Sequence, residues 1–493
     1  MKNKVVVIKA DASDIKYPPF PFLPNKIYPE FNGYYSQADD INDNIVYDAI
    51  RQLFFYLDLD KENFGSKNWN PLGKFLKEGN TVLIKPNWVR DFNPINKKSI
   101  DSLITHTSII RTVIDYVLKG INYKGKIIIG DAPLQNCDFT NLISKNRINA
   151  LLSEYSKRYK NVEFIIEDWR LTIFDRIKGT QKISTQTGGY RMIDLGKESF
   201  LEEISDYSEL FRVTCYNYNL MHEHHKKGKH EYLITNRVFE ADFIINLPKL
   251  KTHIKAGLTG ALKNLIGING HKEFLPHHIK GAYLDGGDNY INPSFWKKLY
   301  EDFDDKVWSS LRGNYTLLNK FNFQILKLLH WCWYLFSKDK VFAGSWSGNE
   351  TIWRTILDLN HIMYFYNTKT NTLDSFPQRN VLTIVDGIIA GQGEGPLLPL
   401  DKKLGIVIGG FNPALIDAVI ARIIGFNISR IPTVYNALYN IKSRFCLKSS
   451  DKDVIIEWVE KNNHTCYDID QIDTITSYNF IPPRYWKRAL SRR

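Results

Sequence analysis

Short apolar runs rich in Val and Ile alternate with segments of helical periodicity, and this alternation most constrains what the chain can fold into. The runs are Lys4–Lys9, Thr81–Ile84, Lys126–Gly130, Val162–Ile166, Asp242–Leu247, Val381–Val385 and Gly405–Ile408. Helical spacing of apolar residues occurs between them, as in Asn141–Tyr159 and Pro413–Ile424. Strands that are apolar throughout and joined by helices are typical of a parallel sheet buried on both faces. We therefore expect an α/β fold with a mostly parallel central sheet and helices on both faces, an arrangement that also allows two lobes around a cleft.

The chain has 493 residues, a length that suits several domain-sized units or one large α/β protein. We expect an α/β core over residues 1–290, which contain most of the predicted strands. Residues 291–375 interrupt this pattern with an aromatic-rich helical segment, and residues 376–430 return to the α/β core. Residues 431–493 are expected to form a mixed C-terminal tail.

The net charge of +12 indicates anionic partners, which include nucleic acid, an anionic membrane surface and phosphorylated or carboxylated small molecules. The alternative is that a charge of this size serves only to keep the protein soluble. The sequence has no recognition motif for nucleic acid, so no nucleic-acid partner is expected. It does not indicate an oligomeric state.

The five cysteines are scattered, and no two have the C-x-x-C spacing: Cys137, Cys215, Cys332, Cys446 and Cys466. Iron–sulfur clusters are usually held by closely spaced cysteines, so no such cluster is expected. An odd number of dispersed cysteines suits reduced thiols in the cytoplasm. The N-terminal apolar run is too short for a signal peptide, and no apolar run reaches the roughly 18 residues of a membrane span. We therefore expect a cytoplasmic protein.

The segment Ala241–Asp288 concentrates more reactive side chains than any other part of the sequence. Cationic or titratable residues occupy alternate positions after its strand: Lys249, Lys251, His253 and Lys255. An extended backbone would place all four on one face. Apolar residues then follow at helical spacing: Leu258, Leu262, Leu265 and Ile266. Positive groups near a helix N-terminus favour an anionic ligand, and a solvated lysine-rich loop is the alternative.

Histidine and acidic residues follow within the same segment: His271, Glu273, His277, His278, Asp285 and Asp288. They could supply metal ligands or an acid and base pair, although no H-x-x-x-H spacing occurs among them. Hydrogen bonding of the imidazoles to the backbone is the structural alternative. A second histidine run, His222–His230, is strongly hydrophilic, and we expect it to be a surface loop.

Polar residues also stand directly after other predicted strands: Lys85, Asn87, Asp131 and Asp386. Ligands of open α/β sheets bind beyond the carboxyl ends of the strands. The glycine-rich segment Gly391–Pro396, which contains Gly393 and Glu394, either lets the backbone approach a ligand or forms a plain turn. It lacks the Gly-Lys-Ser/Thr ending of a Walker loop.

The segment Phe321–Phe336 has an aromatic-rich helical pattern. Its apolar residues Leu326, Leu329, Trp333 and Phe336 fall on one helical face. The segment is too short to span a bilayer. Packing in the core or in an oligomer is the expected role, and peripheral contact with a membrane is the alternative.

Six stretches of the sequence resemble the family called domain of unknown function 362, or DUF362. They are KPNW (Lys85–Trp88), GDAPLQNCDF (Gly130–Phe139), ADFIINLPKLKTHIKAGLTGALKNLIGINGHK (Ala241–Lys272), LPHH (Leu275–His278), VDGIIAGQGEGP (Val385–Pro396) and NPALIDAVIARIIGF (Asn412–Phe426). They occur in the order found in the family, whose name assigns no function. Some relatives carry a fused ferredoxin-like iron–sulfur module, which implies redox chemistry, but this chain lacks the cysteine pattern of that module.

The family is also distantly similar to the lactate racemase type of α/β protein, whose members use Lys and His around a nickel-pincer cofactor. This similarity implies that Lys249, Lys251, His253 and Lys263 lie near a nucleotide-derived cofactor. It is an analogy at the level of the fold.

We predict an enzyme that acts on an anionic small molecule, with redox or isomerase chemistry preferred and phosphoryl or acyl transfer as the alternative. The catalytic residues are predicted to be His253, Lys263 and His277. The substrate-binding residues are predicted to be Lys85, Asn87, Lys249, Lys251, Asn264, Gly393 and Glu394. Asp131 and Asp386 are expected to bind a divalent metal or orient the substrate. A nucleotide-derived cofactor is the other cofactor considered.

The competing hypothesis is a binding protein without catalysis. It would dock on an anionic membrane through residues 321–336 and the basic tail, or join a glycan-assembly complex.

Overall fold

The structure is a computed structural model that describes residues 3–31, 44–97, 99–175, 180–183, 188–214, 216–310, 317–447, 454–461 and 463–490. Cys215 and the last three residues of the basic tail lie outside this range. Among the described residues, eleven strands form a central sheet in the order β20-β19-β1-β18-β17-β11-β2-β3-β4, with β12 pairing with β17 and β13 pairing with β12.

Seven strands of this sheet match the predicted apolar runs, and β12, β13, β19 and β20 are additional. The eleven strands are β1(Lys4–Lys9), β2(Thr81–Pro86), β3(Gly125–Asp131), β4(Val162–Asp168), β11(Phe243–Leu247), β12(Lys249–His253), β13(Gly257–Thr259), β17(Val381–Glu394), β18(Leu398–Gly410), β19(Ile455–Glu460) and β20(Asn463–Tyr467). The row β17-β11-β2-β3-β4 is parallel, as are the pairs β1–β19 and β12–β17. The pairs that β18 makes with β1 and β17, together with β12–β13 and β19–β20, are antiparallel. The predicted mostly parallel sheet is therefore confirmed.

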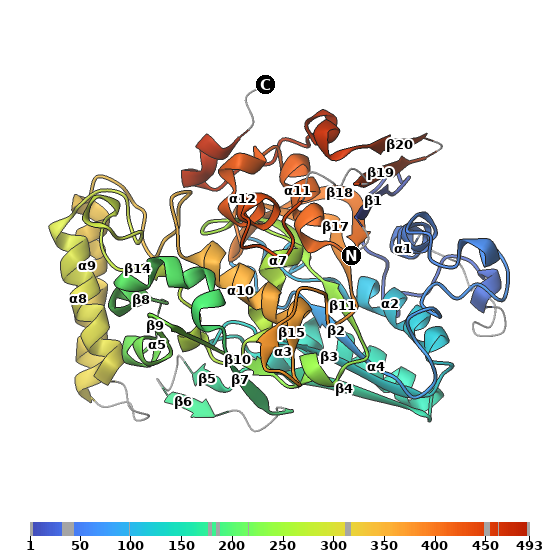
Figure 1. Ribbon diagram of the computed structural model, residues 1–493, viewed down its shortest axis with the longest axis horizontal. Helices are drawn as coiled ribbons and strands as arrows, with labels where there is room; N and C mark the ends of the chain where they lie inside the picture. The colour runs from blue at the N-terminus through green and yellow to red at the C-terminus, as the bar shows by residue number, and fades with distance from the viewer. Residues whose placement is uncertain are drawn as a thin grey trace.

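Helices cover both faces of the sheet, as predicted (Figure 1). Alternate side chains of the strands enter two separate cores, so that Val6 and Ile84 lie in one core while Val5 and Leu83 lie in the other. The first core contains residues of α1(Ile45–Tyr56), α2(Thr107–Gly120), α3(Phe139–Lys145) and α4(Ile148–Arg158). The second contains residues of α7(Ala261–Asn264), α10(Ile352–Phe365), α11(Pro413–Ile424) and α12(Pro432–Tyr439).

Smaller elements surround the central sheet. They are the strand groups β5(Thr172–Asp175) with β6(Thr180–Ile183), β7(Tyr190–Asp194) with β10(Lys229–Thr235) and β9(His225–Lys226), β8(Phe211–Arg212) with β14(His278–Ile279), and β15(Tyr366–Asn367) with β16(Thr372–Leu373), and the short helices α5(Tyr218–His224) and α6(Arg237–Glu240). The predicted surface loop at His222–His230 is wrong. This run forms α5, β9 and the start of β10. His225 and His230 are buried, and their imidazoles are hydrogen-bonded to Phe274 O and Glu202.

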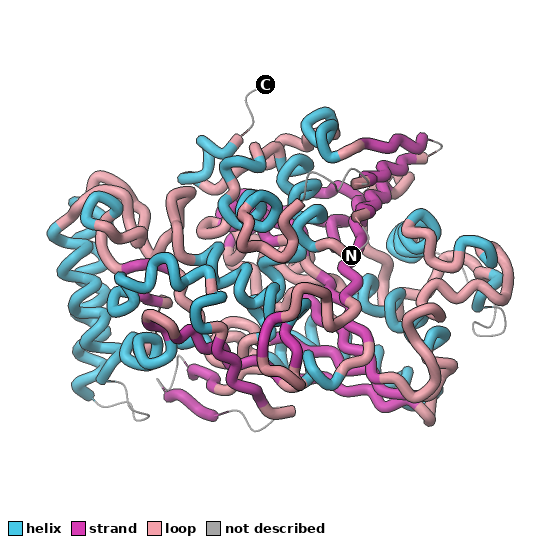
Figure 2. Tube along the Cα trace, viewed as in Figure 1, coloured by secondary structure: helices cyan, strands magenta, loops and turns pink. Residues whose placement is uncertain are grey.

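Helices α8(Phe295–Ser310) and α9(Leu317–Phe336) form a hairpin at the left edge of the view (Figure 1) and are the paired cyan tubes there in Figure 2. The residues between them, 311–316, lie outside the described range. Helix α10, which follows, is instead buried along its whole length. No helix in the described ranges has the length and apolar character needed to cross a bilayer.

Two local predictions around the site are wrong in extent. Leu258 belongs to strand β13 rather than to a helix, because Lys251 to His253 pair antiparallel with Gly257 to Thr259. Helix α7 that follows has only four residues and continues as a 3-10 turn over Leu265–Ile268. The glycine-rich Gly391–Glu394 is strand rather than loop, because it pairs with β18 as far as Glu394 opposite Leu398.

Candidate functional site

The carboxyl ends of adjacent parallel strands bring several predicted site residues together. Strands β11 and β2 are neighbours, and Asn246 lies opposite Lys85 in their register. Strand β3 is next to β2 and ends at Asp131. Asn264, at the end of α7, accepts hydrogen bonds from Asn87 Nδ2 at 2.9 Å and Lys85 Nζ at 3.5 Å through the same oxygen, Oδ1. Sequence positions 85–87, 131 and 264 therefore form one polar cluster at this edge of the sheet.

Lys85 is fully buried and forms an ion pair with Asp131. Its Nζ lies 2.8 Å from Asp131 Oδ1 and also donates to Pro86 O at 2.8 Å. The carboxylate of Asp131 accepts two backbone N–H bonds as well, from Trp88 at 2.6 Å and from Ala132 at 2.8 Å. Gly267 closes over the pair so tightly that an added Cβ would lie 1.9 Å from Asp131 Oδ1. Burial lowers the pKa of Lys85, and the nearby Asp131 charge opposes this shift.

Lys249 forms a second buried ion pair, with Asp386. Its Nζ lies 3.0 Å from Asp386 Oδ2 and 2.5 Å from the hydroxyl of Tyr17. Tyr17 donates to Asp386 Oδ1 at 2.6 Å, and the backbone N–H of His106 donates to Oδ2 at 2.9 Å. The rings of Tyr17 and His106 are stacked with their centroids 3.8 Å apart. Tyr17 and His106 were missed by sequence reasoning because no local pattern marks a loop residue that meets a distant strand.

Lys251 lies two residues further along β12 and has no carboxylate partner among the hydrogen bonds and ion pairs of the described residues. Its Nζ donates to Asn87 Oδ1 at 2.7 Å and to Leu103 O. The side chain is fully buried. Burial, followed by the charges of Lys249 and Lys263, lowers the pKa of Lys251 well below the ordinary lysine value.

His253 follows on the same strand, and its hydrogen bonds define its tautomer. The backbone N–H groups of Lys255 and Ala256 donate to Nδ1 at 3.0 Å and 3.1 Å. Nδ1 therefore carries no proton, and the proton of the neutral imidazole lies on Nε2. Burial and then the charge of Lys263 lower the pKa of His253 well below its usual value, so the ring is neutral and presents an N–H donor.

Lys263, on α7, differs from the other lysines of the site. Its side chain is partly exposed, and no acceptor among the described residues lies within hydrogen-bonding distance of its ammonium. Burial and then the charges of Lys272, Lys255 and Lys85 lower its pKa to about 7. Lys272 donates to Ala132 O at 2.9 Å, and burial lowers its pKa to about 8. Lysine charges thus accumulate here, with the carboxylates of Asp131 and Asp168 nearby.

His277 presents the opposite tautomer to His253. Its Nδ1 lies 2.6 Å from Leu275 O, which can only accept, so Nδ1 carries the proton and Nε2 has a free lone pair. Burial and then the charges of Lys255 and Lys263 lower the pKa of His277 well below its usual value. The site therefore contains one neutral imidazole that can donate and one that can accept.

The N-terminus of α7 does not serve as the predicted anion site. The buried carboxylate of Asp417 on α11 accepts from the N–H groups of Ala261 at 2.6 Å and Leu262 at 3.1 Å. Burial raises the pKa of Asp417 to about 7. The cationic side chains, rather than the helix end, supply the positive potential of the site.

The remaining predicted residues already have partners within the protein, and Gly393 O accepts from the hydroxyl of Thr252 on β12 at 2.8 Å. Gly393 and Glu394 bond to the C-terminal segment, through Gly393 N to Ile481 O at 2.8 Å and Arg484 N to Glu394 Oε1 at 2.6 Å. The two predicted metal ligands, Asp131 and Asp386, each hold a lysine ammonium. Among the described residues, one group of three could offer His, Cys and carboxylate atoms to a metal ion. It consists of Glu457, His464 and Cys466 on β19 and β20, whose ligand atoms lie within 4.8 Å of one another.

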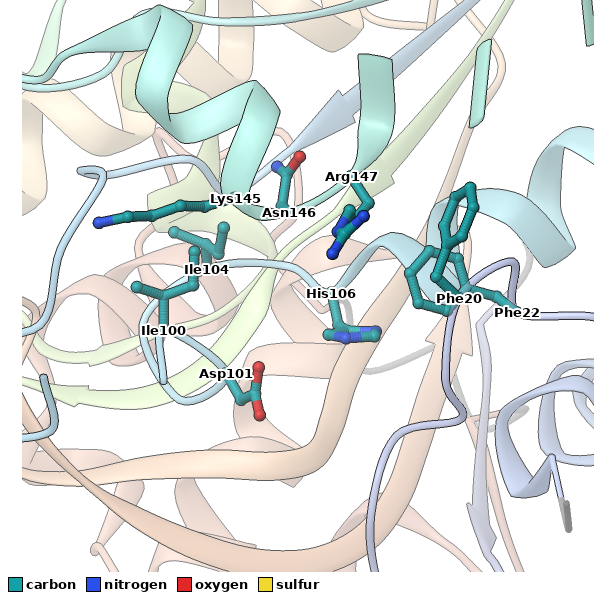
Figure 3. A pocket seen from close by; sticks show the side chains of 9 residues that line it. All are labelled: Phe20, Phe22, Ile100, Asp101, Ile104, His106, Lys145, Asn146 and Arg147. Atoms are coloured by element: carbon teal, nitrogen blue, oxygen red, sulfur yellow. The ribbon is translucent and has the colours of Figure 1, made fainter. Parts of the chain in front are cut away.

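A cavity of about 240 Å³ lies beside the Lys249 pair and shares His106 with it. Figure 3 shows its lining side chains: Phe20, Phe22, Ile100, Asp101, Ile104, His106, Lys145, Asn146 and Arg147. Burial raises the pKa of Asp101, and the charge of Lys249 is near enough to oppose this shift. His106 thus connects the cavity with the Lys249–Asp386 pair.

The sequence of residues 178–422 matches the family described as domain of unknown function (DUF362). The chain belongs to the DUF362 family. The match includes the segments around Lys249, Lys263 and Asp386, whereas KPNW and GDAPLQNCDF lie N-terminal to it. No curated protein matches the chain.

The chain is also similar to a protein from Thermotoga maritima whose crystal structure was solved as a structural genomics target, with 12% sequence identity and a TM-score of 0.31. The similar region covers 75% of this chain and 56% of that chain, so this DUF362 protein spans little more than half the length of the Thermotoga protein.

Proposed function

We propose that this DUF362 protein is an enzyme that binds a phosphorylated or carboxylated small molecule at the cluster formed by Lys251, Lys263, Lys272, His253 and His277, the anion cluster. The observation that carries the proposal is Lys263. Lys263 is partly exposed and its ammonium has no acceptor in the described structure, and burial followed by the charges of neighbouring lysines lowers its pKa to about 7.

The energetics of the cluster favour an anion. Each lysine whose pKa is lowered is destabilised in its charged form relative to the same group in water. The paired lysines Lys85 and Lys249 recover part of this cost from Asp131 and Asp386. Lys263 has no such partner. A bound phosphate or carboxylate would supply the missing negative charge and would raise the pKa of Lys263 in return.

Proton transfer next to a carboxylate or carbonyl is the chemistry that the cluster supports best, and isomerisation is therefore the reaction class that we propose. A neutral Lys263 amine or His277 Nε2 would take a proton from the carbon beside the carbonyl group. The electron pair of the broken C–H bond would move onto the carbonyl oxygen, where His253 Nε2–H and the lysines stabilise the developing charge. The same base or its partner would return the proton to complete an isomerisation. Redox chemistry at the same carbon is proposed as a second possible reaction.

Phosphoryl or acyl transfer is the alternative reaction for the same anion cluster, because lysines also stabilise a transferring phosphoryl group. A nucleotide-derived cofactor fits the cluster through its phosphates, since the lysines and His253 are hydrogen-bond donors. A divalent metal fits less well at Asp131 and Asp386, because lysine and N–H donors occupy their oxygens. The free thiols of Cys137, Cys332 and Cys466 support the proposed cytoplasmic location.

Anion binding is tested by isothermal titration with sulfate, phosphate and small carboxylates against the wild type and Lys263→Met. We expect the substitution to weaken binding by about tenfold, as a lost charge-assisted contact does. Lys369→Met, which removes an exposed lysine from the turn between β15 and β16, is the matched control and should leave binding unchanged. Equal affinities for all three proteins would overturn the assignment of the anion cluster.

The reaction class is tested by incubating the protein with a panel of small carboxylates and phosphorylated carbonyl compounds in D2O. Proton NMR would follow loss of the signal from the carbon beside the carbonyl group. Isomerase chemistry predicts exchange with the wild type and at least about 100-fold slower exchange with His277→Asn or Lys263→Met. Group transfer without exchange would favour the alternative reaction.

A further inference from the structure

The outer face of the α8–α9 hairpin gathers several exposed aromatic and aliphatic side chains. We propose that this face docks on the surface of a lipid bilayer that contains anionic headgroups. The face, called here the hairpin face, consists of Leu328, Trp331, Tyr334, Leu335 and Phe336 of α9 and Phe295 of α8. This inference does not depend on the reaction proposed for the anion cluster.

The inner face of α9 fixes the orientation of the helix. Leu326, Leu329 and Trp333 are buried, and the Trp333 ring stacks on Phe342 with the centroids 5.3 Å apart. These residues were predicted to share a face with Phe336, but Phe336 is 66% exposed. It comes last in the helix and lies near Trp296 of α8, with ring centroids 5.9 Å apart. The helix therefore cannot turn its outward residues into the protein without losing this packing.

The outward residues form an apolar stripe. Leu328, Trp331 and Leu335 are spaced by three and four positions, which places them on one side of the helix. They and Tyr334 are between 48% and 59% exposed. Phe295, which is 72% exposed, extends the stripe onto α8 through Trp296, whose ring lies 5.4 Å from the ring of Phe295. Exposed apolar side chains gathered at one place mark a surface that meets another apolar phase or partner.

The charge of the hairpin face identifies the partner. The sequence between Lys306 and Lys338 contains no Asp or Glu, and Lys327 and Lys338 are exposed beside the stripe. Two acidic residues of α8 turn toward the body of the protein, where Asp302 and Asp305 pair with Lys280 at 2.6 Å and 2.7 Å. The outer face thus combines Trp, Tyr, Phe and Leu with lysine, the composition of a helix that lies in the headgroup region of an anionic membrane.

A second copy of the chain fits this face less well. In a symmetric dimer the same patch is used twice, so the lysines of one copy would approach the lysines of the other. Anionic headgroups instead neutralise Lys327 and Lys338, at about 1 kcal/mol, or about fivefold in affinity, for each lysine. No helix in the described part of the chain can cross the bilayer, so the contact we propose is peripheral.

Flotation of the full chain with vesicles tests the proposal. The vesicles would consist of phosphatidylcholine alone or of phosphatidylcholine with about one third phosphatidylglycerol, at low salt and near 1 M salt, where screening is strong. We expect binding to the anionic vesicles that falls steeply with salt. The triple variant Leu328→Gln, Trp331→Gln, Leu335→Gln should lose at least about tenfold in binding, and so should Lys327→Glu with Lys338→Glu.

Two controls distinguish membrane docking from misfolding and from a general effect of exposed apolar residues. Phe376→Gln with Ile441→Gln removes exposed apolar residues elsewhere, 75% and 96% exposed, and should bind vesicles like the wild type. Circular dichroism confirms that each variant is folded. Absence of vesicle binding by the wild type overturns the proposal, as does equal binding to neutral and anionic vesicles. A dimer in sedimentation velocity that the triple variant dissociates, without vesicle binding, would identify the hairpin face as a self-association surface instead.

Discussion

Burial lowers the pKa of both Lys249 and Lys263, yet the two lysines have opposite surroundings in the structure. Lys249 is completely buried and is held by Asp386 and Tyr17. Lys263 is partly exposed and has no acceptor in the described structure. A fully buried charge with a partner stabilises the fold, and such a residue is called here a framework residue. A charge without a partner at an accessible position can instead bind an anionic ligand. The difference separates lysines that hold the strand ends together from a lysine that is available to a ligand.

The largest expected effect comes from breaking the buried ion pair of Lys249 with Asp386. Lys249→Met would leave the Asp386 carboxylate buried without its cation, and removal of one partner of a buried ion pair costs about 3–5 kcal/mol. Urea denaturation would measure the loss. The matched control is Glu78→Ala, which breaks an exposed pair with Lys124 at 3.0 Å and should cost less than about 1 kcal/mol. If Lys249→Met cost no more than Glu78→Ala, Lys249 would not be a framework residue.

A smaller loss is expected when a pair is pushed apart without removing either charge. Gly267→Ala would place a Cβ 1.9 Å from Asp131 Oδ1 and 2.8 Å from Lys85 Nζ, and overpacking of this kind costs about 1–3 kcal/mol. The same denaturation assay measures it. Gly267 does not have a positive φ, so the steric overlap accounts for the expected loss. An unchanged Gly267→Ala protein would mean that Asp131 and Lys85 can separate freely.

The buried lysines and their carboxylate partners could be predicted from the sequence only in part. Alternation of Lys249, Lys251 and His253 with other residues placed them correctly on an extended strand, because side chains repeat every two positions there. Lys85 and Asp131 were found as residues at strand ends. Their ion pair could not be predicted, because it depends on which strand lies beside which, and lateral strand order is not encoded in local periodicity.

Contacts made across long sequence separations account for the remaining differences. Asp417 caps α7 from a helix more than 150 residues away, and this contact replaced the predicted anion site at that helix. The run Leu258–Ile266 has helical spacing, but pairing of β13 with β12 took its first residues into the sheet. Short apolar runs are ambiguous between strand and helix, and tertiary pairing decides between them.

The lowered pKa of Lys263, which has no ion-pair partner in the described structure, predicts that anion affinity depends on pH. Sulfate is a suitable probe because its charge is constant in this range. Lys263 and Lys272 have pKa values of about 7 and about 8, so both are cationic at lower pH and neutral at higher pH. Sulfate affinity measured by titration calorimetry should therefore fall by at least about tenfold, 1.4 kcal/mol, between about pH 6 and pH 9. Lys263→Met should have a shallower dependence, and an affinity that rises with pH would contradict the assignment.

The smallest expected effect is a gain in stability from removing the unpaired charge. Lys263→Met deletes an ammonium that has no acceptor and lies among other lysines, so we expect about 1 kcal/mol of stabilisation at neutral pH. The folded pKa of about 7 is below that of an unfolded lysine, so the unfolded state binds more protons and wild-type stability rises with pH between these two values. The advantage of Lys263→Met over the wild type should therefore be complete below about pH 7 and vanish above about pH 10. Thermal denaturation of both proteins across this range measures it. An advantage that persists at high pH would show that packing by Met, rather than loss of the charge, is responsible. A destabilised Lys263→Met would show that Lys263 belongs with Lys249 among the framework residues.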